Sequence, residues 1–561
     1  MDSAADTAKN DFVASFSSWD TAESLPEGLS EELRKQYSRT PVRDLNNPAA
    51  INLNIQREFN LTEHLMNAAL ESYPENIAFI AKDRTVTFSQ LDSLVNQAGQ
   101  YLLRHKVSVE RRVVLMLSDP LSFIILFLGA IKIGAVPVAL PHNFREHELR
   151  YLLDDTRAAL AITDPDFYLN IKKICQELPW KTEVTVSQPI VGAESSLQEE
   201  LTECETELSA VPTTADDSAF WLYTQGSSGF PKATVHMHRA PLYVCSSYAR
   251  ELLKITEDDV IFSTSSLFNN LGIMEKIFFP LAFGAAAILF QGQTSEEILE
   301  SLHVHKPTLM FASPEIYADI LEHTDEYLEY PLDSLRLCIS TGRTLPIAVQ
   351  AGWSKSFGLD ILNGLSSTEE LYIFISQRPE CIKIGSVGLP VPGYSVRIED
   401  KDGLPSEMGQ IGDLLVCGGS TAKEFWNKRK KTARSILGNW LDTGDKCLID
   451  DEGFCFFAGR RDDMFFINKQ WVSPIDVERL LGELPQVEQA AVVSAVDADS
   501  KLKLRAFIVL AKNYEPSSET AKEIKIQYNP RQPVHMQIKW IEFVPKLPKS
   551  INGKLQRYKL R

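Results

Sequence analysis

The sequence predicts an α/β protein: a large N-terminal domain built on parallel sheets, then a small β-barrel, then an α+β C-terminal domain. Apolar strand patterns at residues 113–117 and 135–140 enclose an apolar helix pattern at residues 122–133. A strand–helix–strand order of this length indicates a βαβ unit in a parallel sheet that helices cover. From about residue 383, closely spaced glycines and prolines separate short alternating segments, which is typical of an antiparallel barrel or sandwich.

The individual elements follow from the spacing of apolar residues. Residues 61–73 and 89–104 carry apolar side chains at helical spacing, which predicts amphipathic helices. Residues 77–80 and 85–88 alternate as in half-buried strands. Further helix and strand signals occur at residues 146–159, 160–163, 260–263, 277–281, 285–290, 298–303, 309–312, 335–340, 474–483, 490–494 and 506–510.

These patterns divide the chain into three parts. Residues 1–55 are acidic, polar and weakly patterned, and we expect a partly ordered tail there, with a docking segment for a partner as the alternative. Residues 56–461 are the predicted large domain, with the barrel at about 383–461, and residues 462–561 are the small domain. Residues 181–218 are polar and acidic and predict a long surface excursion.

The composition restricts the classes of function. A net charge of −18 argues against broad, sequence-independent binding of nucleic acid. The eight cysteines form no C-x-x-C pair, which indicates a reducing compartment. The N-terminus has no signal-peptide pattern, and the longest apolar run, residues 123–131, is about half of a membrane span. We therefore expect a cytoplasmic protein without a membrane span.

A turn rich in glycine and serine follows the apolar strand pattern at residues 220–223. Glycine lets backbone N–H groups approach a ligand closely, and hydroxyls and a lysine complete a phosphate site. Lys232 stands three residues after Gly229, which does not match the P-loop of NTPases. A surface loop and a nucleotide site are therefore both open. The candidate phosphate-binding residues are Thr224, Gly226, Ser227, Ser228, Gly229 and Lys232.

Four further segments carry side chains that suit a nucleotide. The glycine turn at residues 363–369 ends in Glu369, which could hold Mg²⁺ beside phosphates or lie in the first turn of a helix. Asp445 follows a Thr-Gly pair and could accept two ribose hydroxyls or be an ordinary turn residue. Arg460 lies in a charged joint and Lys554 in a basic tail, and solvated surface is the alternative for both.

The turn rich in glycine and serine and the four further segments, in this order along the chain, resemble the core motifs of the adenylate-forming enzymes. This superfamily comprises acyl-CoA synthetases, peptide-synthetase adenylation domains and luciferases. Within that superfamily the chain is most similar to benzoate–CoA ligases. The similarity runs from about residue 59 to residue 561 and includes residues 127–137, 388–394 and 471–474.

The resemblance implies a reaction in two steps. A carboxylate attacks the α-phosphorus of ATP and gives an acyl-adenylate and pyrophosphate. The thiol of CoA then displaces AMP. The large domain would bind ATP, and the small, mobile domain would rotate between the steps about a hinge that matches Asp462.

The resemblance also implies roles for single residues. Lys232 and its turn would bind the β- and γ-phosphates, Thr368 would approach the α-phosphate, and Glu369 would bind Mg²⁺. Asp445 and Arg460 would hold the ribose. Lys554 would bridge the acid and the α-phosphate. The remaining assignments are Thr341, Gly342, Asn363, Gly364, Leu365 and Ser366 for the adenine site, Phe268, Asn269, Asn270, Gly272 and Tyr372 for the acid pocket, and Lys469 and Trp471 for the pantetheine tunnel.

Several residues depart from the family pattern. Tyr372 stands where benzoate–CoA ligases often have histidine, so the particular acid stays open. Lys469 takes the place of a glycine on the path of the pantetheine arm, where it would either obstruct the tunnel or tilt outward. Three functions follow: an aryl- or acyl-CoA ligase, an adenylate-forming enzyme that delivers the acyl group to an acyl carrier protein or another acceptor, and a binding protein without turnover. A homodimer is compatible with all three.

Overall fold

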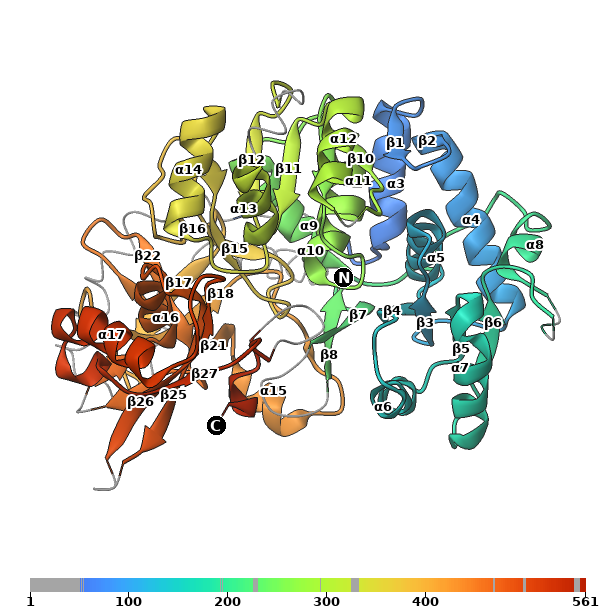
Figure 1. The fold of residues 1–561 in the computed structure, drawn as a ribbon. Helices are drawn as coiled ribbons and strands as arrows, with labels where there is room; N and C mark the ends of the chain where they lie inside the picture. The colour runs from blue at the N-terminus through green and yellow to red at the C-terminus, as the bar shows by residue number, and fades with distance from the viewer. Residues whose placement is uncertain are drawn as a thin grey trace, which may run out of the picture.

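Figure 1 shows the computed structural model, which describes residues 51, 53, 55–191, 193, 195–224, 231–292, 294–323, 332–467, 470–497, 501–548 and 555–560. Two large sheets, smaller antiparallel sheets and a separate C-terminal sheet make up the fold. This confirms the predicted α/β class with an α+β C-terminal part. Within the described ranges, no helix is both long and apolar enough to cross a membrane.

The first large sheet has the strand order β13-β12-β11-β9-β10-β1-β2. Its neighbouring strands are parallel, except that β2 runs antiparallel to β1. Buried parallel strands are expected to read as short apolar runs, as these do. They are β1 (Ile77–Ile80), β2 (Thr85–Thr87), β9 (Val260–Ser263), β10 (Ala286–Ile288), β11 (Leu309–Ala312), β12 (Leu337–Ser340) and β13 (Ile361–Leu362).

The second large sheet has the order β19-β8-β7-β4-β3-β5-β6. The strands from β7 to β6 are parallel, whereas β8 and β19 add an antiparallel edge. β6 and helix α8 lie within residues 181–218, so the predicted surface excursion is wrong there, because Val186 and Leu197 are buried among polar neighbours. The strands are β3 (Arg112–Met116), β4 (Val136–Ala139), β5 (Leu160–Thr163), β6 (Glu183–Val186), β7 (Ser218–Thr224), β8 (Lys232–Met237) and β19 (Glu424–Phe425).

Helix α5 (Pro120–Lys132) is buried along most of its length and packs against α3, α4, β3 and β4. Asp119 caps it by accepting the backbone N–H of Ser122 at 2.8 Å, and Pro120 begins it. The unit β3–α5–β4 is therefore the predicted βαβ unit. The other helices of this part are α3 (Leu61–Ser72), α4 (Phe88–Arg104), α6 (Glu146–Thr156), α7 (Pro165–Glu177), α8 (Leu197–Leu201), α9 (Arg239–Val244), α10 (Asn270–Ile273), α11 (Phe279–Phe283), α12 (Ser295–His305), α13 (Pro314–Glu322), α14 (Ile347–Phe357), α15 (Arg429–Ser435) and the π-helices η1 (Cys245–Leu253) and η2 (Met274–Phe278).

The region after residue 383 is antiparallel, as predicted. A five-stranded sheet joins β17, β18, β21 and β20, with β22 paired to β21. Cys447 and Cys455 are fully buried in it and are therefore core thiols. Its strands are β17 (Ser395–Glu399), β18 (Gly412–Cys417), β20 (Ile436–Leu437), β21 (Trp440–Ile449) and β22 (Cys455–Arg460). A small antiparallel sheet joins β14 (Gly364–Ser366) and β15 (Ile373–Ser376), which precede this region, to β16 (Leu389–Pro390).

The C-terminal part, orange to red in Figure 1, has its own apolar core around Val477, Val492 and Ile508. In its three-stranded sheet, β26 pairs antiparallel with β25 and parallel with β27. The boundaries at residues 55 and 461 stay predictions. The elements are β23 (Phe465–Ile467), β24 (Gln470–Val472), α16 (Pro474–Gly482), β25 (Val487–Val496), β26 (Leu502–Leu510), α17 (Ser518–Tyr528), β27 (Ile538–Phe543) and the 3-10 turns η3 (Asn529–Arg531), η4 (Val534–Met536) and η5 (Arg557–Lys559).

Candidate active site

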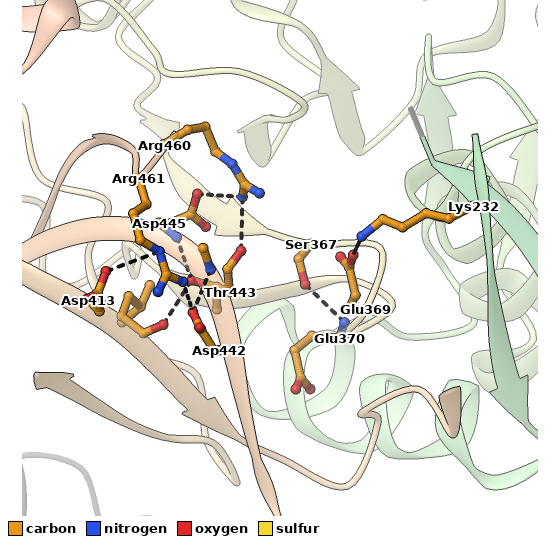
Figure 2. A network of polar contacts seen from close by, with 12 residues as sticks. Lys232, Ser367, Glu369, Glu370, Asp413, Asp442, Thr443, Asp445, Arg460 and Arg461 are labelled. Carbon is orange, nitrogen blue, oxygen red and sulfur yellow. Dashed lines mark hydrogen bonds and ion pairs between the residues drawn. The ribbon is translucent and has the colours of Figure 1, made fainter. Parts of the chain in front are cut away.

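Lys232 and Glu369 meet across the fold although 137 residues separate them in sequence. Lys232 begins β8, and its ammonium Nζ lies 2.9 Å from Oε1 of Glu369 and 3.9 Å from the ring centre of Phe425 (Figure 2). Burial alone would raise the pKa of the Glu369 carboxyl, but the Lys232 charge and hydrogen bond lower it below its ordinary value. The Glu369 side chain is therefore a charged carboxylate at neutral pH.

The segment that carries Glu369 is fixed by its neighbour Glu370. The Glu370 carboxyl is fully buried and accepts hydrogen bonds from the hydroxyls of Thr421 at 2.7 Å and Ser420 at 3.1 Å. Burial raises its pKa to about 8. The backbone N–H of Ala422 also bonds to the Glu369 carbonyl at 2.8 Å. The turn at Glu369 is thus held against the loop that joins β18 to β19.

A second ion pair joins Asp445 and Arg460, which lie opposite each other on β21 and β22. Nη1 of Arg460 donates to Oδ1 of Asp445 at 2.6 Å and to the carbonyl of Thr443 at 3.1 Å (Figure 2). Gly444 has φ +73°, and a Cβ there would lie 3.2 Å from the Arg460 guanidinium. Glycine therefore permits both the turn and the close approach of the arginine.

The two ion pairs belong to one electrostatic environment. The negative charge of Asp445 raises the pKa of Arg460, and that of Glu369 raises it further. Reciprocally, Arg460 contributes to the lowered pKa of Glu369. Figure 2 shows both pairs in one view, with Lys232 and Arg460 on opposite sides of Glu369. Two cationic and two acidic side chains that were predicted to bind phosphate, metal and ribose groups are thus part of one electrostatic environment.

The residues predicted for the adenine site lie at the ends of neighbouring strands. Thr341 and Gly342 follow β12, and Asn363 joins β13 to β14, which Gly364, Leu365 and Ser366 form. The Asn363 amide donates to the carbonyl of Ser386 at 2.9 Å. Its buried Oδ1 has no hydrogen-bond partner among the described residues. A buried acceptor without a partner is costly, so this oxygen is suited to a ligand donor.

Several residues predicted for the acid pocket hold the backbone in this structure. The Asn269 side chain caps α10 by accepting the N–H of Gly272 at 2.9 Å. Asn270 donates to the carbonyl of Leu371 at 3.0 Å, and the Thr368 hydroxyl donates to the Asn270 side-chain oxygen at 3.4 Å. The predicted acid segment is therefore attached to the turn that carries Thr368 and Glu369.

Aromatic side chains surround the remaining two acid-pocket predictions. The ring of Phe268 lies 5.7 Å from Phe123 and 5.6 Å from His142, edge to face. Tyr372 is fully buried, and its hydroxyl donates to Glu275 at 2.9 Å. Sequence reasoning missed Glu275, although a lone carboxylate in the apolar run at residues 271–283 is a visible signal. It also missed Glu370 and Phe425.

Some predicted site residues lie outside the described part of the chain. These are Lys469, Lys554 and four predicted ligands in the phosphate turn, namely Gly226, Ser227, Ser228 and Gly229. The described neighbours of that turn are Thr224, which ends β7, and Lys232, which pairs with it. The backbone of Trp471 lies in β24.

Comparisons with known proteins define the class. Residues 66–426 match the AMP-binding enzyme family, and residues 476–554 match the C-terminal domain of AMP-binding enzymes. The chain therefore belongs to the AMP-binding enzyme family.

The comparisons also support the resemblance to benzoate–CoA ligases. The chain is 36% identical to a 4-hydroxybenzoate–CoA/benzoate–CoA ligase of Rhodopseudomonas palustris, over 86% of this chain and 90% of that protein. It is 36% identical to a benzoate–CoA ligase of Thauera aromatica, over 94% and 99%. The crystal structure of an anthranilate CoA ligase in complex with anthranoyl-AMP matches with a TM-score of 0.83 at 32% identity, over 91% and 98%.

Proposed function

We propose that this protein is an AMP-forming acid–thiol ligase that activates an aromatic carboxylic acid with ATP and transfers the acyl group to CoA. The observation that carries this proposal is the pairing of Lys232 with Glu369 beside Arg460 and Asp445. Relatives at 36% identity over most of both chains carry names of benzoate–CoA ligases. The products would be an acyl-CoA thioester, AMP and pyrophosphate.

In the first step, an oxygen of the acid carboxylate attacks the α-phosphorus, and the bond to pyrophosphate breaks. Negative charge increases on the phosphate oxygens as this bond breaks, so cations aimed at them stabilise the transition state. Lys232 would exchange Glu369 for the β- and γ-phosphates. Asp445 would turn from Arg460 to the ribose hydroxyls. Lys554, from the small domain, would bridge the acid and the α-phosphate.

Mg²⁺ at Glu369 fits the donors that are present. Within the described residues, no three His, Cys, Asp or Glu side chains cluster tightly enough to hold a metal by themselves. Mg²⁺ usually takes one or two carboxylates and fills its other positions with water and substrate phosphates. The Glu369 carboxylate is charged and 19% exposed, so it can serve as that single protein ligand. Bound there, Mg²⁺ would neutralise charge on the phosphates.

In the second step, the CoA thiolate attacks the acyl carbon, and AMP leaves. We propose residues 56–461 as the large domain and residues 462–561 as the small domain, which would turn at Asp462 to bring in the thiol. Lys469 bears on the identity of the acceptor. Replacing it with glycine should speed thioester formation if its side chain obstructs the pantetheine path, and an unchanged rate would show that it does not.

An aromatic acid suits the surroundings of Phe268, because Phe123 and His142 present ring edges and faces to it. The relatives are named for benzoate, hydroxybenzoate and anthranilate, and we place the acid in this class. Tyr372, bonded to the buried Glu275, replaces the histidine of benzoate–CoA ligases, so the ring substituent remains to be measured. A homodimer, a carrier-protein acceptor and a cytoplasmic location stay predictions.

The decisive experiment measures AMP release with ATP, Mg²⁺ and single acids, with and without CoA. The acids are benzoate, 4-hydroxybenzoate, anthranilate and acetate. We expect steady AMP release only with an aromatic acid and CoA together, and a loss of about 10²- to 10³-fold in Lys554→Ala. Adenylate that accumulates regardless of CoA would favour a carrier-protein acceptor. No turnover with any acid would favour a binding protein.

A further inference from the structure

Arg557 makes a fork of contacts inside the C-terminal domain. Its Nε and Nη2 donate to the two carboxylate oxygens of Glu478 at 3.1 and 2.5 Å, and its Nη1 donates to Asp463 at 3.3 Å. The Arg557 side chain is 10% exposed and that of Glu478 is 14% exposed. A planar, bidentate arginine of this kind fixes direction as well as distance.

The partners of Arg557 are themselves fixed in the domain. Glu478 lies on α16, and its Oε1 also accepts the backbone N–H of Val492 on β25 at 2.8 Å. Asp463 directly follows the predicted hinge residue Asp462. Arg557 therefore joins residues near the C-terminal end of the chain to the α16–β25 layer and to the residue directly after the predicted hinge.

The described residues that follow Lys554 are fixed next to this fork. The backbone N–H of Gln556 donates to the carbonyl of Pro548 at 2.8 Å. Leu555 and Leu560 pack against the apolar core of the domain. The residue directly after Lys554 in sequence is therefore attached to the domain, two residues before Arg557.

We infer that Arg557 is a positioning residue for Lys554, because it fixes the residues that directly follow Lys554 in sequence and ties them to the domain and to Asp463 beside the predicted hinge. The inference rests on the proposed role of Lys554 in adenylation. Arg557 and both of its ion-pair partners follow Asp462 in sequence, so the fork moves with the small domain in either orientation. A misplacement of about 1 Å can cost two orders of magnitude in rate, so the effect of losing the fork should fall on the step that uses Lys554.

The test compares Arg557→Gln, Arg557→Lys and the charge exchange Arg557→Glu with Glu478→Arg. The matched control is Arg479→Gln, which removes an arginine–glutamate pair that is 48% and 60% exposed in the same domain. Two half-reactions are measured: pyrophosphate release from ATP and benzoate without CoA, and thioester formation from synthetic benzoyl-adenylate and CoA. Limited trypsin digestion with mass spectrometry follows cleavage after Lys554 independently of activity.

In Arg557→Gln we expect adenylation to fall about tenfold or more, while thioester formation changes less than twofold. Cleavage after Lys554 should become about tenfold faster, with partial recovery in the lysine variant and the exchange. The control should match the wild type. Unchanged cleavage in Arg557→Gln, or an equal loss in both half-reactions, would overturn the inference. A wild type inactive in both half-reactions would contradict the proposed function, and trypsin cleavage would then decide the positioning.

Discussion

At the scale of single residues, the site contains cations and carboxylates that neutralise one another. Lys232 bonds to Glu369, and Arg460 bonds to Asp445. Each group is one that a nucleotide, its phosphates or a metal could take over. The Lys232 and Glu369 side chains are partly exposed, and exposed ion pairs contribute only about 0–1 kcal/mol to stability. This pair is therefore suited to opening when a ligand arrives. The Asp445 side chain is only 4% exposed, so its pair with Arg460 is more costly to break unless a ligand replaces the arginine.

This leads to a prediction for Glu369→Gln. The amide keeps the shape of the side chain but removes the negative charge, so we expect adenylation to fall about 10²-fold. The free energy of unfolding should change by less than about 1 kcal/mol, because the pair is partly exposed. Pyrophosphate release and urea denaturation measure the two quantities.

The control is Glu177→Gln, which removes a carboxylate from the exposed pair with Arg150. It should leave both quantities unchanged. Full adenylation activity in Glu369→Gln would remove this residue from the proposed machinery.

The sequence predicts the principal residues of the site but not their supports. Lys232, Glu369, Asp445 and Arg460 stand in recognisable motifs, and the structure brings them together in two pairs. The supports come from elsewhere in the chain. Glu370 is held by Ser420 and Thr421, 50 and 51 residues away. A single sequence contains no signal for contacts between such distant segments, so they appear only in the folded chain.

At the scale of elements, strands in the parallel sheets were predicted well, because they are short apolar runs. The π-helices η1 and η2 were not predicted. Their apolar residues follow nearly the same spacing as in an α-helix, and π-helical hydrogen bonds leave no separate pattern in the sequence. β27 and α17 were missed too. β27 has its charged residues, Lys539 and Glu542, three positions apart, which is not the alternation of a half-buried strand. Among the described residues it pairs only with β26, so its assignment depends on a partner strand.

Two buried histidines make the second large sheet sensitive to acid. Burial lowers the pKa of His236 to about 3 and of His238 to about 4, from 6.5. His238 accepts the backbone N–H of Leu61 at 3.1 Å and so joins α3 to the end of β8. Neutral histidines stabilise the fold above pH 6.5, and this contribution is lost as the pH falls towards the folded pKa.

We therefore predict that His238→Gln lowers the dependence of stability on pH. As the pH falls from 7.5 to 5.5, each buried histidine should lower the free energy of unfolding of the wild type by about 1.4 kcal/mol. In the variant, the decrease in the free energy of unfolding over this range should be smaller by that amount. Urea denaturation at both pH values measures it. The exposed His303→Gln serves as the control. Equal pH dependence in wild type and His238→Gln would contradict the explanation.

The single turn of helix α10, which contains Gly272, predicts a large effect of one added methyl group. A Cβ on Gly272 would lie 2.1 Å from the backbone oxygen of Ser266. Backbone cannot move away as a side chain can, so Gly272→Ala should destabilise the protein by about 1–3 kcal/mol. Because Asn269 and Asn270 belong to the same turn, we also expect the KM for the acid to rise.

The matched control is Gly352→Ala within α14, where the nearest atom to a new Cβ is a Leu321 methyl at 3.4 Å. Alanine should be neutral there or stabilise the helix by about 0.5–1 kcal/mol. Thermal denaturation and steady-state kinetics with the acid found active in the panel provide the measurements. A Gly272→Ala protein as stable as the wild type would show that the turn adapts.

At the scale of the whole molecule, the beginning of the described chain is part of the core. The side chains of Ile51, Leu53 and Ile55 are half-buried against the main apolar core. The N–H of Phe59 then bonds to the carbonyl of Thr213 at 2.7 Å. These anchoring residues fall at the end of the predicted polar tail of residues 1–55.

This feature predicts a sharp boundary for truncation. Removal of residues 1–50 should leave the rate of adenylation within about twofold of that of the full chain. The free energy of unfolding should stay close to that of the full chain. Removal of residues 1–58 should destabilise the protein by roughly 3 kcal/mol, because three half-buried aliphatic side chains are lost. Urea denaturation of the two shortened chains and the full chain measures the difference. Equal stability of both shortened chains would contradict the anchoring role.

The joint between the two cores is secured on both sides of Asp462. The N–H of Arg461 bonds to Gly444 at 2.8 Å, and its guanidinium pairs with Asp442, whereas Asp463 is held by Arg557. Two turn hydrogen bonds span the joint, from the N–H groups of Asp463 and Met464 to the Arg460 carbonyl at 2.9 and 3.0 Å. Breaking each costs about 1 kcal/mol. If the small domain rotates at Asp462, the φ and ψ angles of this single residue define the path of the rotation. The allowed regions of φ and ψ then limit how far the domain can turn.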